Sequence, residues 1–268
     1  MSEDSVLFER RGQTVVLTMN RPARRNALSL DMIVRMADAW DAIDADDTIR
    51  SAILTGAEGA YCVGGDLDAG WMAGRQAAEP TENEKRAVAD MSIVARGLLL
   101  RDWLRTPIIA VVNGDCMGGG CEMLQQTDIR IAEEQARFGV PEAKRGLIAG
   151  AGSTMRLKRQ IPYAVAMEML LTGRNLDAEE AMRWGLVSHV VPAGQGLAKG
   201  LEIAGIIAAS GPLSVAASKA SAIETGWLPE SEAGPIEQRY AAMVTRSNDA
   251  QEGMKAFIEK RAPSFTGT

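Results

Sequence analysis

The chain has 268 residues, of which 46% are hydrophobic and 24% are charged, and its formal net charge is −6. This length and composition predict one large globular domain, or one domain with an appendage. The acidic balance argues against a nucleic-acid-binding protein, because such proteins usually present a basic face.

The first half alternates β-branched runs with helical periodicity. Strands are predicted at 14–19, 51–55 and 108–112, with helices at about 28–40 and 84–104 between them. Beyond about residue 147 the strand signal nearly vanishes, and helices are predicted around 152–159, 163–171, 178–184, 197–209, 213–224, 236–245 and 250–260. This order predicts an α/β fold with a helical C-terminal region.

The cysteines and the histidine exclude several kinds of site. Cys62, Cys116 and Cys121 fit neither a disulfide framework nor a zinc-ligand spacing, and a single histidine, His189, excludes sites built on a histidine pair. We therefore expect no metal site, and a reducing compartment such as the cytoplasm. His189 lies in the apolar run 185–192, which predicts a strand, and we interpret this histidine as structural.

Neither a targeting segment nor a membrane span is expected. The first five residues are acidic, unlike a transit or signal peptide. The longest uncharged run, 203–218, is interrupted by glycine, serine and proline. It is therefore a poor match to the ~20 apolar residues of a membrane-spanning helix.

Two predicted strands lead into unusual glycine-rich turns. One reads GAYCVGGDL at 59–67, and the other reads NGDCMGGGCE at 113–122. Neither matches a nucleotide-binding motif. Consecutive glycines let a ligand approach bare backbone N–H groups, so the turns could form an oxyanion hole. They could equally be tight turns that let helices pack close to strands.

Two glutamates follow structure-breaking segments. Glu122 comes directly after the triple glycine, and Glu142 follows the segment FGVP at 138–141. Two carboxylates in one site shift each other's pKa, so that one can serve as acid and the other as base. Taken singly, each could also be an ordinary helix-start glutamate favoured by the helix dipole.

Taken together and in order, these segments resemble the enoyl-CoA hydratase/isomerase (crotonase) family. The resemblance covers nearly the whole chain and rests on NRPARRNALS at 20–29, AYCVGGDL at 60–67, the turn at 113–122, FGVPE at 138–142 and GLIAGAGST at 146–154, with TGR, GLV and EGMKAF further on.

The resemblance implies the architecture and the assembly. A crotonase-like spiral of β-β-α units over 1–195 would bind acyl-CoA and carry catalysis. A helical C-terminal region over 196–268 would form trimers and contribute to the CoA site. We therefore expect a homo-oligomer, either a trimer or a dimer of trimers.

The resemblance also implies the catalytic residues. The N–H groups of Gly65 and Gly119 would hold the thioester oxygen, and Glu122 and Glu142 match the two glutamates of the hydratases. The expected reaction is the reversible addition of water to a 2-enoyl-CoA, with Glu142 exchanging a proton with the α-carbon and Glu122 activating water. We expect no metal or redox cofactor.

Further contacts follow from the same resemblance. The residues expected to bind CoA are Arg24, Ala27, Asp66, Leu67, Asp68, Phe257 and Lys260, the last two on a neighbouring subunit. Candidate walls of the acyl pocket are Trp71, Met72, Met91 and Trp103, although such side chains often belong to the core.

Two alternatives to a hydratase remain at this stage. One is other crotonase-family chemistry on acyl-CoA, by a double-bond isomerase, a carnitinyl-CoA-type dehydratase or a hydrolase. The other is a protein that binds acyl-CoA without turnover.

Overall fold

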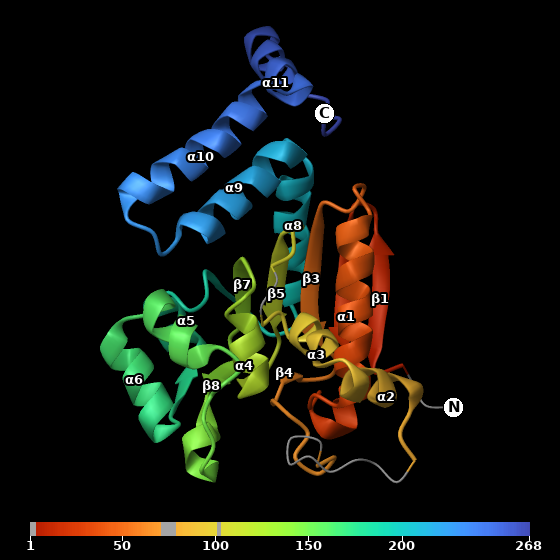
Figure 1. Ribbon diagram of the computed structural model, residues 1–268, viewed down its shortest axis with the longest axis vertical. Coiled ribbons are helices and arrows are strands. Elements are labelled where there is room, and N and C mark those ends of the chain that lie inside the picture. Colours follow the sequence, from red (N-terminus) through yellow and green to blue (C-terminus); the bar gives the residue numbers. More distant parts are fainter. Residues whose placement is uncertain (1–3, 71–78, 101–102) are drawn as a thin grey trace.

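The computed structural model describes residues 4–70, 79–100 and 103–268, and two sheets organise them (Figure 1). The larger sheet has the order β1-β2-β3-β5-β7-β10. β1 is antiparallel to β2, and the other neighbours are parallel. Its strands are β1 (Val6–Arg11), β2 (Thr14–Met19), β3 (Ser51–Gly56), β5 (Ile108–Val112), β7 (Ile129–Glu133) and β10 (His189–Val191).

The smaller sheet has the order β4-β6-β8-β9 and consists of three-residue strands. They are β4 (Ala60–Cys62), β6 (Asp115–Met117), β8 (Arg137–Gly139) and β9 (Asn175–Asp177). Consecutive strands alternate between the sheets, since β3, β5 and β7 lie in the larger sheet while β4, β6 and β8 lie in the smaller one. Helical segments follow each pair of strands, which confirms the predicted spiral of β-β-α units.

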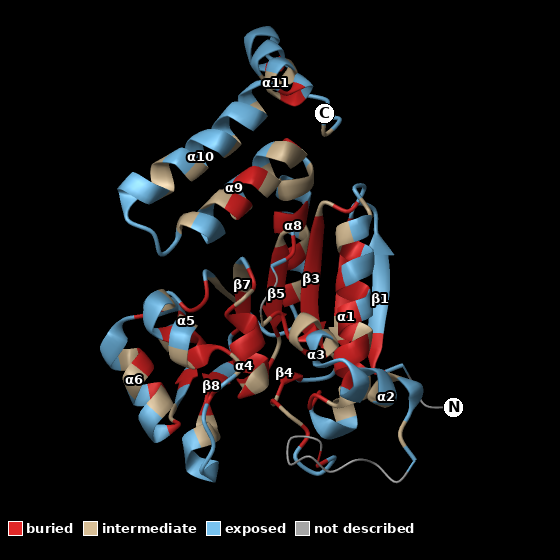
Figure 2. Ribbon diagram, in the orientation of Figure 1, coloured by how far each residue is buried: buried red, intermediate tan, exposed pale blue. Residues whose placement is uncertain are grey.

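Both faces of the larger sheet are covered, which explains its continuous apolar strands. Along β2, Val15 and Leu17 belong to the main core, which also includes residues of α1 (Leu30–Ala45). Val16 faces the opposite way, into a smaller cluster that includes Ile203 of α8. The burial of β3 and β5 between these layers is visible in Figure 2.

Helix α8 (Gly196–Ala208) lies directly on the larger sheet because two glycines face it. A Cβ on Gly196 would lie 2.6 Å from Val111, and one on Gly200 would lie 3.0 Å from the same side chain. By contrast, α9 (Pro212–Thr225), α10 (Glu230–Thr245) and α11 (Asn248–Glu259) extend beyond the sheet (Figure 1). The part of the helical region that stands away from the sheet therefore begins after α8.

The single helix predicted at 84–104 is wrong. The structure has α2 (Glu82–Ala89) and α3 (Met91–Gly97), separated at Asp90. The Asp90 carboxylate accepts the N–H of Ser92 and caps α3, so this residue favours a new helix start over helix continuation. The remaining helices are α4 (Gly119–Leu124), α5 (Ser153–Gln160), α6 (Tyr163–Thr172) and α7 (Ala178–Arg183).

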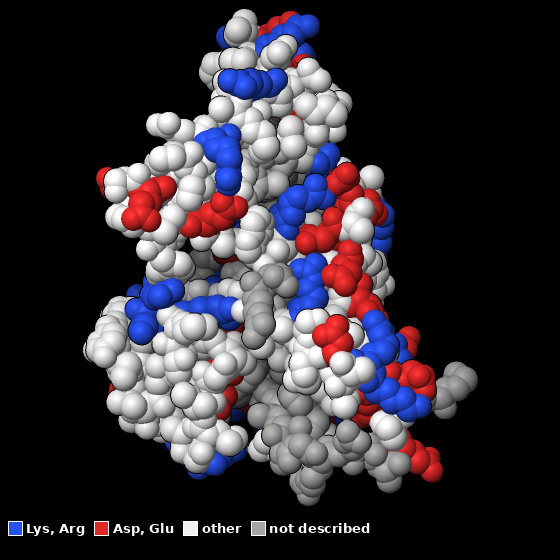
Figure 3. All heavy atoms as spheres, viewed as in Figure 1, with Lys and Arg blue, Asp and Glu red and all other residues white. Residues whose placement is uncertain are grey.

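Ion pairs tie α1 to the helices beside it. Arg86 of α2 contacts Asp38 of α1 at 2.7 Å, and Arg96 of α3 contacts Asp41 at 2.8 Å. Cationic and anionic side chains alternate over this face in Figure 3. Such exposed pairs contribute little individually, typically about 0–1 kcal/mol each.

Lys219 attaches α9 to the sheet. Its ammonium donates to Asp128 at 2.7 Å and to the carbonyl of Thr106 at 3.0 Å, and its side chain is 8% exposed. We expect Lys219→Met to lower the free energy of unfolding by about 1–3 kcal/mol, because it removes a largely buried ammonium group that makes two hydrogen bonds, one of them to a carboxylate. Chemical denaturation measures this change. Lys199→Met, which removes a more exposed pair within α8, is the control, and equal losses in the two variants would contradict the expectation.

Among the described residues, no single helix is long and apolar enough to cross a membrane. The pair α8 and α9 passes that test only when taken together, and the two helices meet at a bend of 108°. No group of three or more potential metal-ligating side chains occurs in the same described part of the chain.

Candidate active site

The first glycine-rich turn follows β4 and is fixed by a bridge to Leu28. Leu28 donates its N–H to the carbonyl of Gly64 (2.8 Å) and accepts the N–H of Asp66 (3.0 Å). Both bonds involve the neighbours of Gly65, so the N–H of Gly65 points away from Leu28. This N–H has no backbone acceptor among the described residues, and it is therefore available to a ligand.

The second turn leads from β6 into α4. Gly118 adopts a φ of +53°, and no side chain caps the helix. Gly119 is the first residue of α4, so its N–H is one of the four that a helix leaves without an intrahelical partner. A Cβ on Gly119 would lie 3.9 Å from the nitrogen of Gly65. The structure thus brings the two predicted oxyanion donors together.

Glu122 projects from the first turn of α4 and is 3% exposed. Its Oε1 accepts the N–H of Ser153 at 3.2 Å. Burial raises the pKa of Glu122 to about 7, and the nearby charge of Glu142 acts in the same direction, while the Ser153 N–H opposes them. Glu122 can therefore hold or release a proton near neutral pH.

Glu142 lies in the short 3-10 helix η3 (Pro141–Arg145), which follows β8. Burial raises its pKa above the usual value, and Arg145 partly offsets this effect. A Cβ on Gly118 would lie 3.0 Å from Oε1 of Glu142, so this carboxyl group touches the second turn. Its Oε2 is buried and has no hydrogen-bond partner among the described residues. A buried acceptor of this kind is suited to a reacting group.

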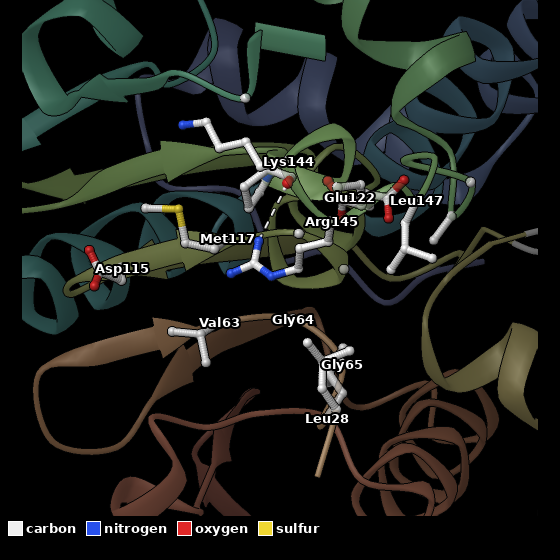
Figure 4. Close-up of a pocket in the computed structure, with 18 of the residues that line it drawn as sticks. Leu28, Val63, Gly64, Gly65, Asp115, Met117, Glu122, Lys144, Arg145 and Leu147 are labelled. Atoms are coloured by element: carbon white, nitrogen blue, oxygen red, sulfur yellow. Dashed lines mark hydrogen bonds between the residues drawn. The ribbon is translucent and has the colours of Figure 1, made fainter. Parts of the chain in front are cut away.

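Both glutamates and both turns line one pocket of about 840 Å³, a volume typical of small-molecule sites. Figure 4 shows its two facing walls. One wall carries Leu28, Val63, Gly64 and Gly65, and the opposite wall carries Glu122, Lys144, Arg145 and Leu147.

The two ends of this pocket differ in chemistry. At one end, Asp115 pairs with Arg137 at 2.8 Å and also with Arg25. Leu147 lies at the other end (Figure 4), and the next residue, Ile148, also lines the pocket. An elongated ligand with a polar part and an apolar part would match this asymmetry.

A second hollow of about 380 Å³ adjoins the first and shares Arg25, Val63, Gly65, Leu67 and Arg145 with it. All of the CoA-binding residues predicted in the N-terminal part line this hollow, namely Arg24, Ala27, Asp66, Leu67 and Asp68. The predicted contact surface is therefore continuous with the catalytic pocket.

Arg24 is already paired within this hollow. Its guanidinium contacts Asp66 at 3.0 Å and Asp68 at 2.5 Å. A phosphate at Arg24 would compete with two carboxylates. Arg145 makes no ion pair with any described residue, so its charge is more available to an anionic ligand.

Phe257 and Lys260 lie far from the pocket in the same chain. Phe257 belongs to α11 and is 86% exposed, and Lys260 ends that helix. Figure 1 shows α11 at the end of the molecule opposite η3 and β8. Neither residue lines the two hollows, so their contact with CoA stays a prediction about a neighbouring subunit.

Two of the four predicted acyl-wall residues, Met91 and Trp103, do not line the pocket. Trp71 and Met72 lie outside the described residues. Met91 is 62% exposed and does not line the pocket. Trp103 lines a different cavity, which lies against Pro107 and the C-terminal helices. The helical spacing of these side chains did not indicate which face of the chain they would occupy.

Several residues that line the pocket were not predicted from the sequence. Lys144 and Arg145 lie two and three residues after Glu142, and this position in the chain is a usable signal. Asp115 and Arg137 become neighbours because β6 and β8 pair in register. The spacing of these two residues in the sequence does not indicate that they are neighbours, because their proximity depends on the pairing of the strands.

The fold and the site together define an α/β protein in which two glycine-rich turns, the buried Glu122 and the half-buried Glu142 line one pocket. Comparison with known proteins agrees with this class. The sequence pattern of the enoyl-CoA hydratase/isomerase family matches residues 9–268, and the chain belongs to this family.

Individual relatives cover nearly the entire chain. An enoyl-CoA hydratase of Mycobacterium tuberculosis is 48% identical over 98% of this chain and 97% of its own length. The (E)-benzylidenesuccinyl-CoA hydratase of Thauera aromatica is 36% identical over 98% of this chain and 99% of its own length. A solved structure from Mycobacterium abscessus, described as an enoyl-CoA hydratase/isomerase, has a TM-score of 0.89 and 52% identity, and the match covers 98% of this chain and 100% of that one.

Proposed function

We propose that the protein is an enoyl-CoA hydratase, which adds water reversibly across the α,β double bond of a 2-enoyl-CoA. One observation carries this proposal: two backbone N–H donors and two carboxyl groups with raised pKa values, one buried and one half-buried, line a single pocket. The relatives named as hydratases support it.

The two glycine N–H groups stabilise the enolate. Attack of water on the β-carbon moves negative charge onto the thioester oxygen, which accepts hydrogen bonds from Gly65 and Gly119. One such preorganised donor typically contributes about 10²–10³ in rate. The positive end of α4 adds to this stabilisation.

The two glutamates share the proton transfers. In hydration, ionised Glu122 removes a proton from the attacking water, and protonated Glu142 delivers a proton to the α-carbon. In dehydration, ionised Glu142 takes the α-proton and protonated Glu122 protonates the departing hydroxyl group. Either direction requires that the pair hold one proton in total.

This requirement predicts a bell-shaped dependence of kcat/KM on pH. Above about pH 7 the buried Glu122 ionises, and the pair then lacks an acid. At low pH both carboxyl groups are protonated, and the pair lacks a base. The acidic limb lies above the usual pKa of glutamate because burial also raises the pKa of Glu142. The pH profile of crotonyl-CoA hydration measures both limbs, and a flat rate across pH 5–9 would contradict the shared-proton mechanism.

The two hollows give the substrate one orientation. The CoA part lies along the second hollow and passes Arg145, and the thioester reaches Gly65 and Gly119. The acyl group extends towards Leu147 and Ile148. The pocket thus receives the apolar chain at its apolar end, where burial is favourable.

The test of this function is turnover of 2-enoyl-CoAs of increasing length. The protein should consume the conjugated enoyl absorbance of crotonyl-CoA or a longer homologue and form the 3-hydroxyacyl-CoA. Tight binding of acyl-CoA without turnover of any member would reject the hydratase in favour of a binding protein. Conversion of a 3-enoyl-CoA alone would favour an isomerase.

We further propose that the protein works as a homo-oligomer, in the cytoplasm, and without a metal or redox cofactor. The C-terminal region exposes large apolar side chains, notably Trp227 between α9 and α10 and Met254, Phe257 and Ile258 on α11, and such surfaces typically pack against a partner. The three cysteines are free and buried, which suits a reducing compartment. Sedimentation equilibrium distinguishes a trimer or hexamer from a monomer.

A further inference from the structure

Ser153, the first residue of α5, is held by the side chains of Glu122 in α4 and of Gln125, the residue that follows this helix. Its N–H donates to Glu122 at 3.2 Å, and its hydroxyl accepts the side-chain amide of Gln125 at 2.7 Å. Glu122 and Gln125 are three residues apart and therefore lie on the same face of α4. All three residues are buried. One side of α4 thus contacts both the backbone and the side chain of the same serine.

Gln125 is itself anchored from three directions. Its amide nitrogen also donates to the carbonyl of Cys121 at 3.0 Å. Its main-chain carbonyl accepts Gln160, the last residue of α5, at 2.8 Å and Arg130 of β7 at 3.1 Å. Gln125 therefore connects both ends of α5 and the larger sheet to the helix that carries Glu122.

Arg156 also contacts the start of α5, where its guanidinium donates to the carbonyl of Ala151 at 3.4 Å. Gly152 precedes the helix with a φ of +123°, and no side chain caps it. The carboxylate of Glu122 takes the place of the missing cap by accepting the Ser153 N–H. The direction of that N–H thus depends on how firmly the Ser153 hydroxyl is held.

We propose that Gln125 and Ser153 are positioning residues: their hydrogen bond keeps the Ser153 N–H directed at Glu122 and so fixes the orientation of the Glu122 carboxylate. Neither side chain touches the substrate. This inference rests on the proposed hydratase function only for its kinetic test, because the position and protonation of Glu122 can also be measured without turnover.

Gln125→Met removes the hydrogen bond to Ser153. Methionine fills a similar volume, and it also removes Oε1 of Gln125, which is buried without a partner among the described residues. Both hydrogen bonds of the Gln125 amide nitrogen, to Ser153 and to Cys121, are lost, so we expect a moderate loss of thermal stability. Well below the unfolding temperature of the variant, we expect kcat for crotonyl-CoA hydration to fall about 5- to 20-fold with KM unchanged, since small misplacements of catalytic groups have effects of up to about 10².

Ser153→Ala provides the second variant, and Ser153→Thr, which keeps the hydroxyl, should restore part of the loss. The Gln125→Met/Ser153→Ala double variant should be no worse than either single variant, because both remove the same bond. Gln126→Met is the matched control. Gln126 is the adjacent amide, which donates to the carbonyl of Leu99 at 2.9 Å, and its loss should leave kcat unchanged.

A second readout does not depend on activity. The groups around Glu122 that affect its charge are Glu142 of η3, Arg156 of α5 and the N–H groups of Ser153 and Ala151. A weaker Ser153 N–H bond stabilises the ionised form less, so the pKa of Glu122 should rise in Ser153→Ala and Gln125→Met. Titration of carboxyl-¹³C glutamate by NMR, with the signal assigned by Glu122→Gln, measures this change.

The outcomes are distinct. Loss of kcat together with a raised pKa of Glu122, both absent in Gln126→Met, supports the inference. Unchanged kcat and pKa in both variants would overturn it, as would kcat losses that only follow losses of thermal stability. If the parent protein turns over no enoyl-CoA, the hydratase function fails, and the NMR titration still decides whether Gln125 and Ser153 position Glu122.

Discussion

Replacing either Glu122 or Glu142 by glutamine is expected to lower kcat for hydration of a 2-enoyl-CoA by about 10²–10⁴, with little change in KM. Each loss corresponds to the usual contribution of one positioned acid–base group. Glutamine keeps the shape and the hydrogen-bonding capacity of the side chain, so the pocket should still bind substrate.

The double variant should be little worse than the more damaged single variant, because the two carboxyl groups act as a unit that shares a proton. Glu179→Gln, in the exposed first turn of α7, serves as the control for removal of one negative charge. Retention of most of the hydratase activity by either single variant would show that the two-carboxylate mechanism is wrong. A 3-enoyl-CoA adds a further test, since a simple double-bond shift needs only Glu142.

Gly118→Ala should lower kcat about 10²-fold although it replaces no catalytic side chain. The new methyl carbon would lie 3.0 Å from Oε1 of Glu142, and φ at this position is +53°. Glu142 must therefore move, and the adjacent Gly119 N–H moves with the turn. A displacement of about 1 Å in an active site can reduce the rate by about 10².

Gly146→Ala is the matched control for this substitution. Gly146 ends η3 with a φ of +68°, so alanine meets similar backbone strain there, but no described atom lies within 4 Å of its Cβ position. We expect kcat of Gly146→Ala to stay within a few-fold of the parent value, since backbone strain of about 1–2 kcal/mol reduces stability more than chemistry. Comparable kcat losses in the two variants would mean that strain, and not the displacement of Glu142, is responsible.

The parts of the fold that could be predicted are those with a strong local signal. The strands β2, β3 and β5 are β-branched runs of five or six residues, and the helices of the second half have clear apolar periodicity. β4, β6, β8 and β9 have three residues each, which is too short for an alternating pattern. β7 contains the buried Arg130, whose partners are carbonyls and an amide from distant segments.

Part of the site could also be predicted from the sequence, and part of it could not. The two turns and the two glutamates stand in recognisable motifs, and the structure brings them together in one pocket. The ion pairs of Asp115 and the roles of Gln125 and Ser153 depend on neighbours that only the packed helices and sheets create. Gln125 and Ser153 are 28 positions apart, so no periodicity of the sequence indicates the hydrogen bond between them.

The proposed reaction adds the elements of water to a 2-enoyl thioester. Mass spectrometry of the product formed from crotonyl-CoA in D₂O tests whether this addition takes place. We expect a 3-hydroxyacyl-CoA that carries one non-exchangeable deuterium at the α-carbon. This deuterated product should be absent when the Glu142→Gln variant replaces the parent protein. Recovery of unchanged crotonyl-CoA, or of an isomer without added water, would contradict the proposed reaction.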